Sequence, residues 1–208
     1  ALCTANLPEP TIGANSATQA DDHFNTVLYT GDEGTQAITG VGFQPDWLWI
    51  KVRNEVNSHY IFDSSRGVDQ ALFSDLPSAE VDYSATGRMT AFGTDGFTVE
   101  TSGSTGTNGN DDTYVAWNWK ANGGTATASG SESGNNPAYS VQANPTAGFS
   151  IVTYTGTGAT GTVPHGLGAV PKMIICKNRN NGDDNAYWAV YHGENTAAPA
   201  TDYLVLNT

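Results

Sequence analysis

Positively charged residues are scarce in this sequence of 208 residues. Lysine and arginine together number 8, against 21 aspartates and glutamates, which gives a formal net charge of −13. Binding to nucleic acid or to an anionic membrane requires a basic surface that neutralises phosphate groups. The composition therefore predicts no nucleic-acid partner and no membrane insertion. The excess of acidic groups favours solubility and can attract cations.

Cysteines and long apolar runs are also few. The two cysteines, Cys3 and Cys176, are too few for a disulfide framework. Cys176 ends the apolar run 173–176, where we expect a small buried residue; a disulfide with Cys3 is the alternative. No run approaches the ~20 apolar residues of a membrane span, and the first residues lack the pattern of a signal peptide. Because the sequence opens with Ala1, we expect an internal piece of a longer protein or a processed product.

Glycine and small polar residues are abundant. The chain contains 24 glycines, and charged residues make up only 14% of it, below the value of about 25% that is typical of soluble proteins. Clusters of Gly, Asp, Asn and Pro recur at about 8–12 residues, which is the spacing of turns in a sandwich or barrel. The pattern predicts an all-β chain with strands at residues 24–30, 36–39, 46–53, 58–63, 70–74, 88–92, 97–101, 113–120, 139–142, 149–155, 172–179, 186–191 and 203–206.

One stretch of the sequence occurs twice. Residues 24–54 align with residues 149–180 with a single one-residue gap. The two copies share Val-x-Tyr-Thr-Gly, then Gly-x-Gly-x-x-Pro, then Lys-x-Arg-Asn at the end. The two copies begin about 125 residues apart. This period is too long for a solenoid repeat and fits the length of a domain. The sequence therefore predicts tandem modules.

The repeat and the composition divide the chain into four segments. We expect an extended lead-in or linker at 1–20, a first β-sandwich module at 21–122, a Gly/Ser/Asn-rich linker at 123–147, and the first half of a second, related module at 148–208. Half a sandwich leaves strand edges and a core face uncovered. We therefore expect that the chain continues, or that the half-module is completed by the first module or by another chain.

The strand at 46–53 is apolar on both faces at its start. In strand geometry, one face carries Trp47, Trp49, Lys51 and Arg53, and the other carries Leu48, Ile50 and Val52. A strand that is apolar on both faces lies in the middle of a sheet with structure above and below it. Val115, Trp117 and Trp119 likewise share one face of their strand, and we expect these aromatic side chains to meet in the core.

The repeated strand end provides the first candidate site. Lys51, Arg53 and Asn54 recur as Lys177, Arg179 and Asn180, and these types can bind sugar hydroxyls or carboxylates in a fixed geometry. The alternative is structural, with an internal salt bridge to one of the acidic residues and the asparagine opening a turn. Aromatic residues near loops are candidates for stacking on sugars, and these are Tyr60, Tyr83, Tyr187 and Trp188; the alternative for each of them is packing in the core.

Metal and catalytic sites have weaker signals. The acidic turn Asn110, Asp111 and Asp112 is a candidate calcium site, although it lacks the twelve-residue EF-hand pattern; we expect no other cofactor. Glu80 and Asp82 lie on one face of a strand, as glycosidase carboxylates can. The third acid of the Glu-x-Asp-x-Glu pattern is missing, and there is no nucleophile elbow or phosphate loop.

A set of short motifs covers nearly the whole chain. They are CTANLPEP at 3–10, Phe-x-x-Val-x-Tyr-Thr-Gly, GVGFQPD at 40–46, the Lys-x-Arg-Asn strand end, FDS-x-RG at 62–67, DGF at 95–97, TYVAWNWKA at 113–121 and HGLG-x-x-PK at 165–172. This set resembles repeated modules in tail-fibre and other virion structural proteins of tailed bacteriophages, especially marine ones.

The resemblance implies a fold, a location and a role. The implied fold is an antiparallel β-sandwich of the jelly-roll or concanavalin-like type, followed here by a partial second copy. The implied location is the virion, outside the cell, in a homotrimer with neighbouring fibre proteins and in contact with the host surface. We therefore expect a non-enzymatic structural module of a phage tail fibre. The alternatives are a carbohydrate-binding module of a bacterial extracellular or surface fibre, which would bind a host-surface glycan, and a polysaccharide depolymerase.

Overall fold

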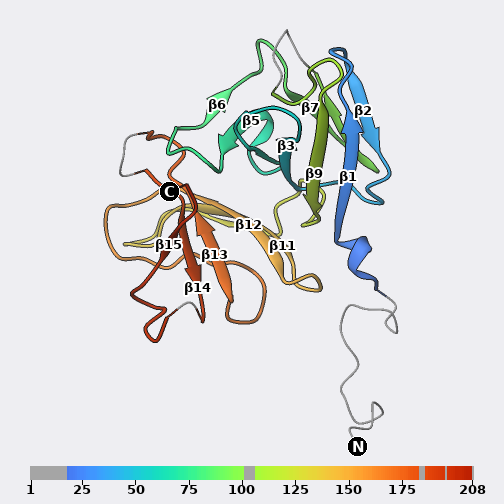
Figure 1. Ribbon diagram of the computed structural model, residues 1–208. Coiled ribbons are helices and arrows are strands. Elements are labelled where there is room, and N and C mark those ends of the chain that lie inside the picture. Colours follow the sequence, from blue (N-terminus) through green and yellow to red (C-terminus); the bar gives the residue numbers. More distant parts are fainter. Residues whose placement is uncertain (1–17, 101–105, 183–185, 195, 208) are drawn as a thin grey trace, which may run out of the picture.

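The computed structural model describes residues 18–100, 106–182, 186–194 and 196–207, and they form two β units (Figure 1). The first unit contains β1 to β9 and the second contains β10 to β15. The elements are η2 (Ala20–Asp22), β1 (Phe24–Thr30), β2 (Gln36–Thr39), β3 (Trp47–Val52), β4 (Tyr60–Asp63), β5 (Gly67–Phe73), β6 (Val81–Asp82), β7 (Met89–Gly93), β8 (Gly96–Val99), β9 (Thr113–Trp119), β10 (Ala128–Gly130), β11 (Tyr139–Asn144), β12 (Phe149–Tyr154), β13 (Met173–Cys176), β14 (Ala189–His192) and β15 (Leu204–Val205).

The all-β prediction is confirmed. Every named strand pairs antiparallel with its neighbours, and the described residues hold no α-helix, only the single 3₁₀ turn η2. The first unit is a sandwich of a six-stranded sheet, β1-β9-β3-β4-β5-β6, and a three-stranded sheet, β2-β8-β7. The second unit has two three-stranded sheets, β10-β11-β12 and β13-β14-β15. Among the described residues no helix has the length and hydrophobicity that crossing a membrane requires.

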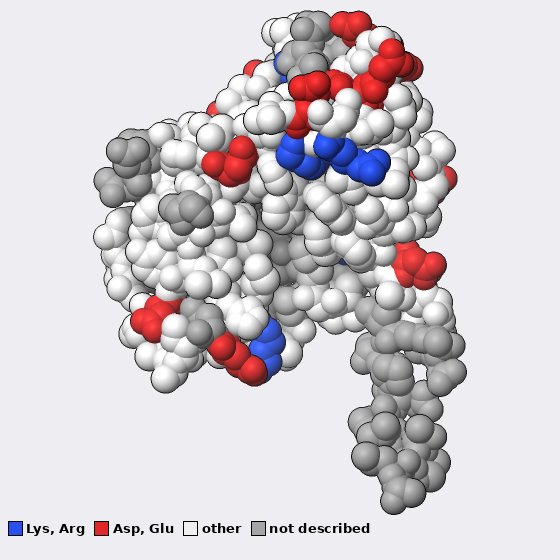
Figure 2. Space-filling model, viewed as in Figure 1, with Lys and Arg blue, Asp and Glu red and all other residues white. Residues whose placement is uncertain are grey.

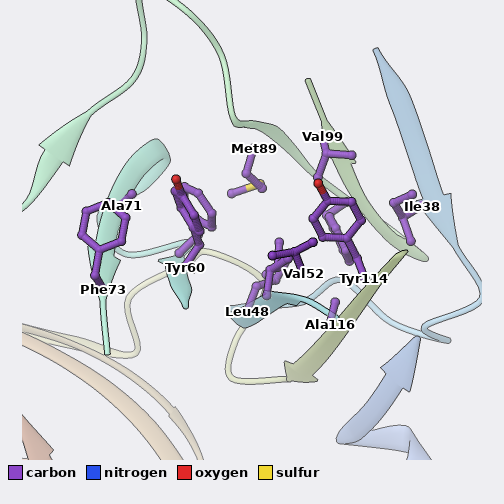
Figure 3. Packing of buried hydrophobic residues seen from close by; sticks show 13 residues of the cluster. Ile38, Leu48, Val52, Tyr60, Ala71, Phe73, Met89, Val99, Tyr114 and Ala116 are labelled. Carbon is purple, nitrogen blue, oxygen red and sulfur yellow. The ribbon is translucent and has the colours of Figure 1, made fainter. Parts of the chain in front are cut away.

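The core of the first unit lies between its two sheets (Figure 3). Leu48, Ile50 and Val52 point into it from β3, as the alternation of that strand predicts. Tyr114 and Ala116 come from the neighbouring β9, and all five side chains are fully or almost fully buried. The second sheet closes the core with apolar residues, namely Ile38, Met89, Phe97 and Val99.

The tryptophans of β3 and β9 lie on the opposite face of the six-stranded sheet. Trp47 contacts Trp119 with ring centroids 4.6 Å apart, and Trp49 contacts Trp117 at 6.0 Å. These rings are only partly buried and lie outside the sandwich core. The tryptophans contact one another as expected, but the expectation that they do so in the core is wrong. The rings of Trp119 and of Phe149 in β12 are 6.3 Å apart, so the second unit covers part of this tryptophan face. β3 is therefore covered on both faces, as predicted.

The passage from the first unit to the second is held by a buried aspartate. The carboxylate of Asp46 is fully buried and accepts hydrogen bonds from the amides of Ala121, Gly123 and Gly124 at 2.7–2.9 Å. The hydroxyl of Ser64 donates to the same carboxylate at 2.7 Å. These bonds satisfy a buried charge with backbone donors, so they fix the chain where it leaves β9.

Residues 123–147 are more ordered than their linker-like composition suggests. They contain β10 and β11, which pair with β12 in one sheet, so the predicted linker is instead part of the second unit. Gln142 is buried and donates to the hydroxyl of Ser65 in the first unit at 2.6 Å. The predicted lead-in at 1–20 lies almost entirely outside the described residues.

Candidate functional site

The two lysines of the repeated strand end make the same turn contacts in both copies, and Lys177 also donates to the carbonyl of Pro77 in the first unit at 2.8 Å. Lys51 donates to the carbonyls of Val52 at 2.6 Å and Glu55 at 3.2 Å, which are one and four residues further along the chain. Lys177 donates to the carbonyls one and four residues further along, at 2.8 and 3.4 Å. Each ammonium group therefore closes the turn after its strand. This turn geometry explains why a lysine recurs there without any ligand.

The two arginines differ. Arg53 is exposed, and its guanidinium makes no hydrogen bond or ion pair within the described part of the chain. Arg179 makes a bidentate ion pair with Glu80 of the first unit, with Nε–Oε2 and Nη2–Oε1 distances of 3.0 and 2.7 Å. Glu80 also accepts from Nη1 of Arg66 at 2.7 Å, and Arg66 pairs with Asp63. For Arg179 the structural alternative, an internal salt bridge, is the one observed.

This ion-pair cluster sets the charge state of Glu80. Partial burial acts to raise the pKa of Glu80, but the hydrogen bonds from Arg179 and Arg66 outweigh it and lower the pKa below its usual range. The same hydrogen bond raises the pKa of Arg179. A carboxyl group held ionised in this way is unsuited to the general-acid role of a glycosidase, which needs a raised pKa. The pKa of Asp82 is lowered as well, mainly by the hydrogen bond from the amide of Ser84. Neither carboxyl group of the pair therefore has the raised pKa that a general acid needs.

The two asparagines also differ, but in the opposite sense to the arginines. Asn54 accepts from the Thr113 amide at 2.9 Å and donates to the Asp112 carboxylate at 3.1 Å, and it thereby holds the start of β9. The side chain of Asn180 is exposed and makes no such bond to the described residues. Asn54 is therefore occupied by the fold, whereas Asn180 remains available.

Two of the aromatic candidates are not available for ligand stacking. Tyr60 lies in the core cluster of the first unit and is 6% exposed. Trp188 is 4% exposed, packs against Trp47 and Trp49, and donates from Nε1 to the carbonyl of Phe73 at 2.7 Å. The prediction that these two rings are exposed near loops is wrong, because each faces a neighbouring sheet.

Two other tyrosines do lie at the surface. The rings of Tyr187 and Tyr203 stack with centroids 5.8 Å apart, and their hydroxyl groups lie 2.8 Å apart. Tyr83, in contrast, packs against the core and under the guanidinium of Arg88. Of the aromatic side chains proposed to contact sugars, Tyr187 is thus the one that the fold leaves accessible.

The acidic turn at 110–112 serves the fold of the first unit. Asp112 is buried and bonded to Asn54, and Asn110 donates to the carboxylate of Asp111 at 2.9 Å. No group of three or more His, Cys, Asp or Glu side chains within the described ranges is arranged to hold a metal ion. Figure 2 shows acidic side chains gathered at one end of the molecule beside a small basic group, while most of that face is uncharged.

An open pocket lies at the edge of the second unit. It has a volume of about 280 Å³ and includes Arg179 from beyond the end of β13. Tyr154 is half-exposed, and its hydroxyl lies 3.3 Å from the thiol of Cys176. That hydrogen bond, with the charge of Cys176 and partial burial, raises the pKa of Tyr154 to about 12. The other lining residues are Gly130, Ala138, Tyr139, Ser140, Thr153 and Thr155.

Cys176 differs from its prediction as a small buried residue. Its thiol is free. Cys176 is partly exposed because its strand lies at an open edge of the second unit. Cys3, the alternative disulfide partner, lies outside the described residues.

Sequence reasoning did not single out the pocket residues of β10 and β11. The strand predicted at 139–142 is found as β11, but composition assigns its segment to a linker, so Tyr139 and Ser140 are not among the predicted site residues.

Comparison with known proteins gives a family and no relatives. Residues 19–208 match one family model, that of a domain of unknown function, DUF7483. No curated protein and no solved structure matches the chain.

Proposed function

The chain belongs to the DUF7483 family, and from that premise we propose that it is a non-enzymatic structural module of a phage tail fibre or another virion appendage, contributing to attachment to the host surface. The family description carries no activity, so the proposal rests on the motif resemblance and on the architecture. In the proposed setting the module works outside the cell, as part of a homotrimer with neighbouring fibre proteins.

The observation that carries this proposal is the contact between the two units. Trp188 is buried in a cluster with Ile61 of β4 and Leu72 of β5 in the first unit, and Arg179 pairs with Glu80 across the same junction. Buried aromatic contacts with a charged pair resist bending better than a flexible tether does. An elongated appendage that transmits contact to a host needs such stiff joints between its modules.

Assembly and attachment are tested separately. Sedimentation of the chain with its neighbouring fibre segments attached should give three copies per particle, and a stable monomer contradicts the trimeric assignment. Fluorescently labelled protein should bind a panel of bacterial surface polysaccharides. Absence of binding to every member contradicts the attachment role, and release of reducing ends contradicts the non-enzymatic assignment.

A carbohydrate-binding module of a bacterial surface fibre is the second candidate, and the pocket at Tyr154 favours it. Two tyrosine rings, three hydroxyl side chains and a guanidinium match the apolar faces and hydroxyl edges of a sugar. Replacing Tyr139 by Ala should weaken binding to a positive glycan about tenfold, the loss expected from a single aromatic contact. Val56→Ser, at a fully exposed position of the first unit, is the control and should leave binding unchanged.

A further inference from the structure

The second unit repeats part of the six-stranded sheet of the first unit. The sequence repeat matches β12 with β1 and β13 with β3, and the pairing extends this match to β14 and β15. The corresponding pairs are Trp47↔Asp63 with Met173↔His192, Ile50↔Tyr60 with Cys176↔Ala189, and Tyr60↔Phe73 with Ala189↔Val205. The sheet β13-β14-β15 therefore has the order and register of β3-β4-β5.

One strand of that arrangement has no counterpart. In the first unit β9 lies between β1 and β3 and pairs with both. Within the described parts of the chain, no strand lies between β12 and β13. The hydroxyl–thiol contact between Tyr154 and Cys176 bridges the two strands instead.

The open edge of β12 is the edge that β1 presents to β9. Backbone groups of alternate residues point to opposite edges of a strand. The amide of Gly31 donates to the carbonyl of Asp112 at 2.8 Å, so Gly31 and every second residue before it face β9. Gly31 matches Gly156, but it is the amide of Thr155 that donates to Ala138, at 3.2 Å, beside β11. β11 thus occupies the other edge, and the edge corresponding to the β9 side remains open.

The edge of β13 is open on the corresponding side. The amide of Gly193 donates to the carbonyl of Lys172 at 2.8 Å, so Lys172 and alternate residues after it face β14. Met173 and Ile175 therefore direct their backbone groups to the open side, as Trp47 and Trp49 do toward β9. The amide of Glu80 binds the carbonyl of Arg179 at 2.8 Å, which marks the end of the open stretch.

Residues that contact β9 in the first unit are retained in the second without that contact. Tyr29 stacks on Tyr114 of β9 with ring centroids 4.8 Å apart and an interplanar angle of 11°. Its counterpart Tyr154 stacks on no ring in the described residues and is 49% exposed. Asn54 holds the first residue of β9, whereas the side chain of Asn180 has no equivalent bond.

The matched glycines Gly31 and Gly156 also show that no described residue fills the β9 position in the second unit. A Cβ atom at Gly31 would overlap the carbonyl oxygen of Gly109, in the loop that leads into β9. The matched Gly156 has nothing within 4 Å of the same position. The first unit needs a glycine there for close backbone approach, and the second unit keeps the glycine with nothing yet approaching.

We propose that the gap between β12 and β13 binds a strand of the β9 type from a partner polypeptide. The partner strand is extended, runs antiparallel to both edges, and begins short of Arg179, whose carbonyl already accepts from the amide of Glu80. It presents alternately an aromatic and a small side chain toward Tyr154 and Cys176, as Tyr114 and Ala116 do in the first unit. Such strand addition gains main-chain hydrogen bonds on both edges and specificity from alternate side chains. It depends on this chain's own geometry and not on the proposed function.

The test uses the whole chain and a peptide with the sequence of residues 107–121. Labelled peptide should bind with saturable anisotropy, and a scrambled peptide of the same composition should not. Hydrogen exchange followed by NMR should show new protection at the amides of Val152, Tyr154 and Ile175. Displacement of the phenol from the thiol should make Cys176 react with a thiol reagent at a changed rate.

Matched variants separate strand addition from nonspecific binding. Gly156→Ala should leave the free chain as stable as before and weaken peptide binding about tenfold or more, because the added methyl group meets the incoming backbone. Val56→Ser, at a fully exposed turn of the first unit, is the control and should bind as the parent chain does.

Four outcomes overturn the proposal, and the first three concern the peptide. They are the absence of saturable binding, protection confined to the first unit through exchange of its own β9, and equal binding by the Gly156→Ala and parent chains. Dimerisation of the chain that protects the same three amides without peptide also overturns it, because the occupant is then a second copy.

Discussion

Strands β3 and β13 occupy matching places in the two units and differ in what covers them. Both follow a Gly-x-Gly turn whose glycines have positive φ, 88° and 87° in the first unit and 72° and 72° in the second. Both end in a lysine that closes the next turn. Yet Leu48 is 0% exposed, whereas its counterpart Ile174 is 49% exposed. The local sequence therefore determines the strand and its turns, and the neighbouring strands determine whether it is buried.

The largest expected effect comes from truncating these two matched side chains. Leu48→Ala should lower the free energy of unfolding by about 2–5 kcal/mol, because it leaves a cavity in a closed core. Ile174→Ala should change it by less than about 0.5 kcal/mol, as at an exposed site. Urea denaturation measures both. Equal losses would mean that the core of the second unit is closed in solution.

The matched glycines Gly31 and Gly156 test the same difference between the two units. Gly31→Ala should destabilise the chain by about 1–3 kcal/mol through the clash with the loop before β9. Gly156→Ala should be close to neutral or slightly stabilising, because its position is open. The midpoints of thermal unfolding compare the two, and a large loss in Gly156→Ala would contradict the open edge.

The junction between the units is tested by pH. The pKa of Glu80 is lowered in the folded chain, so its stabilising contribution is present above its ordinary pKa of 4.5 and is lost as pH falls below that value. Glu80→Gln should cost about 1 kcal/mol at pH 7 and should flatten the decline in stability below pH 4.5. Denaturation midpoints measured across this pH range check the slope. Asp95→Asn, which alters another carboxylate with a lowered pKa but far from the junction, is the control for general acid effects.

A small effect is expected at the two lysines, which close the same turn in both units. Lys51→Met and Lys177→Met should each cost about 0.5–1.5 kcal/mol, since each removes hydrogen bonds to backbone carbonyls. The urea midpoint should shift in both variants, and by more in Lys177→Met, which also loses the bond to the carbonyl of Pro77. A change in one variant alone would mean that the shared turn geometry is not what the lysine provides.

Strands and turns could be predicted from the sequence where short-range rules determine them. Each predicted strand is found, with several ends shifted by one to three residues. Two observed strands, β6 and β10, were not predicted. They are two and three residues long and lie in polar segments without alternation. The two-faced pattern of 46–53 also gave the correct central position of β3.

Contacts between distant segments could not be predicted in the same way. The recurrence of Arg53 and Arg179 is visible in the sequence, but only the docking of the second unit brings Arg179 to Glu80. Tyr60 follows a polar turn and resembles a loop residue. The burial of all four residues of β4 comes from its place between β3 and β5.

All five tryptophans of the chain gather where the two units meet. Trp47, Trp49, Trp117 and Trp119 line one sheet face, and Trp188 approaches from the other unit. The chain thus carries its own fluorescent probe of the junction, because the described core cluster of the first unit contains no tryptophan. Energy passes readily between rings at these separations. The emission spectrum of this chain should therefore change when the two units separate.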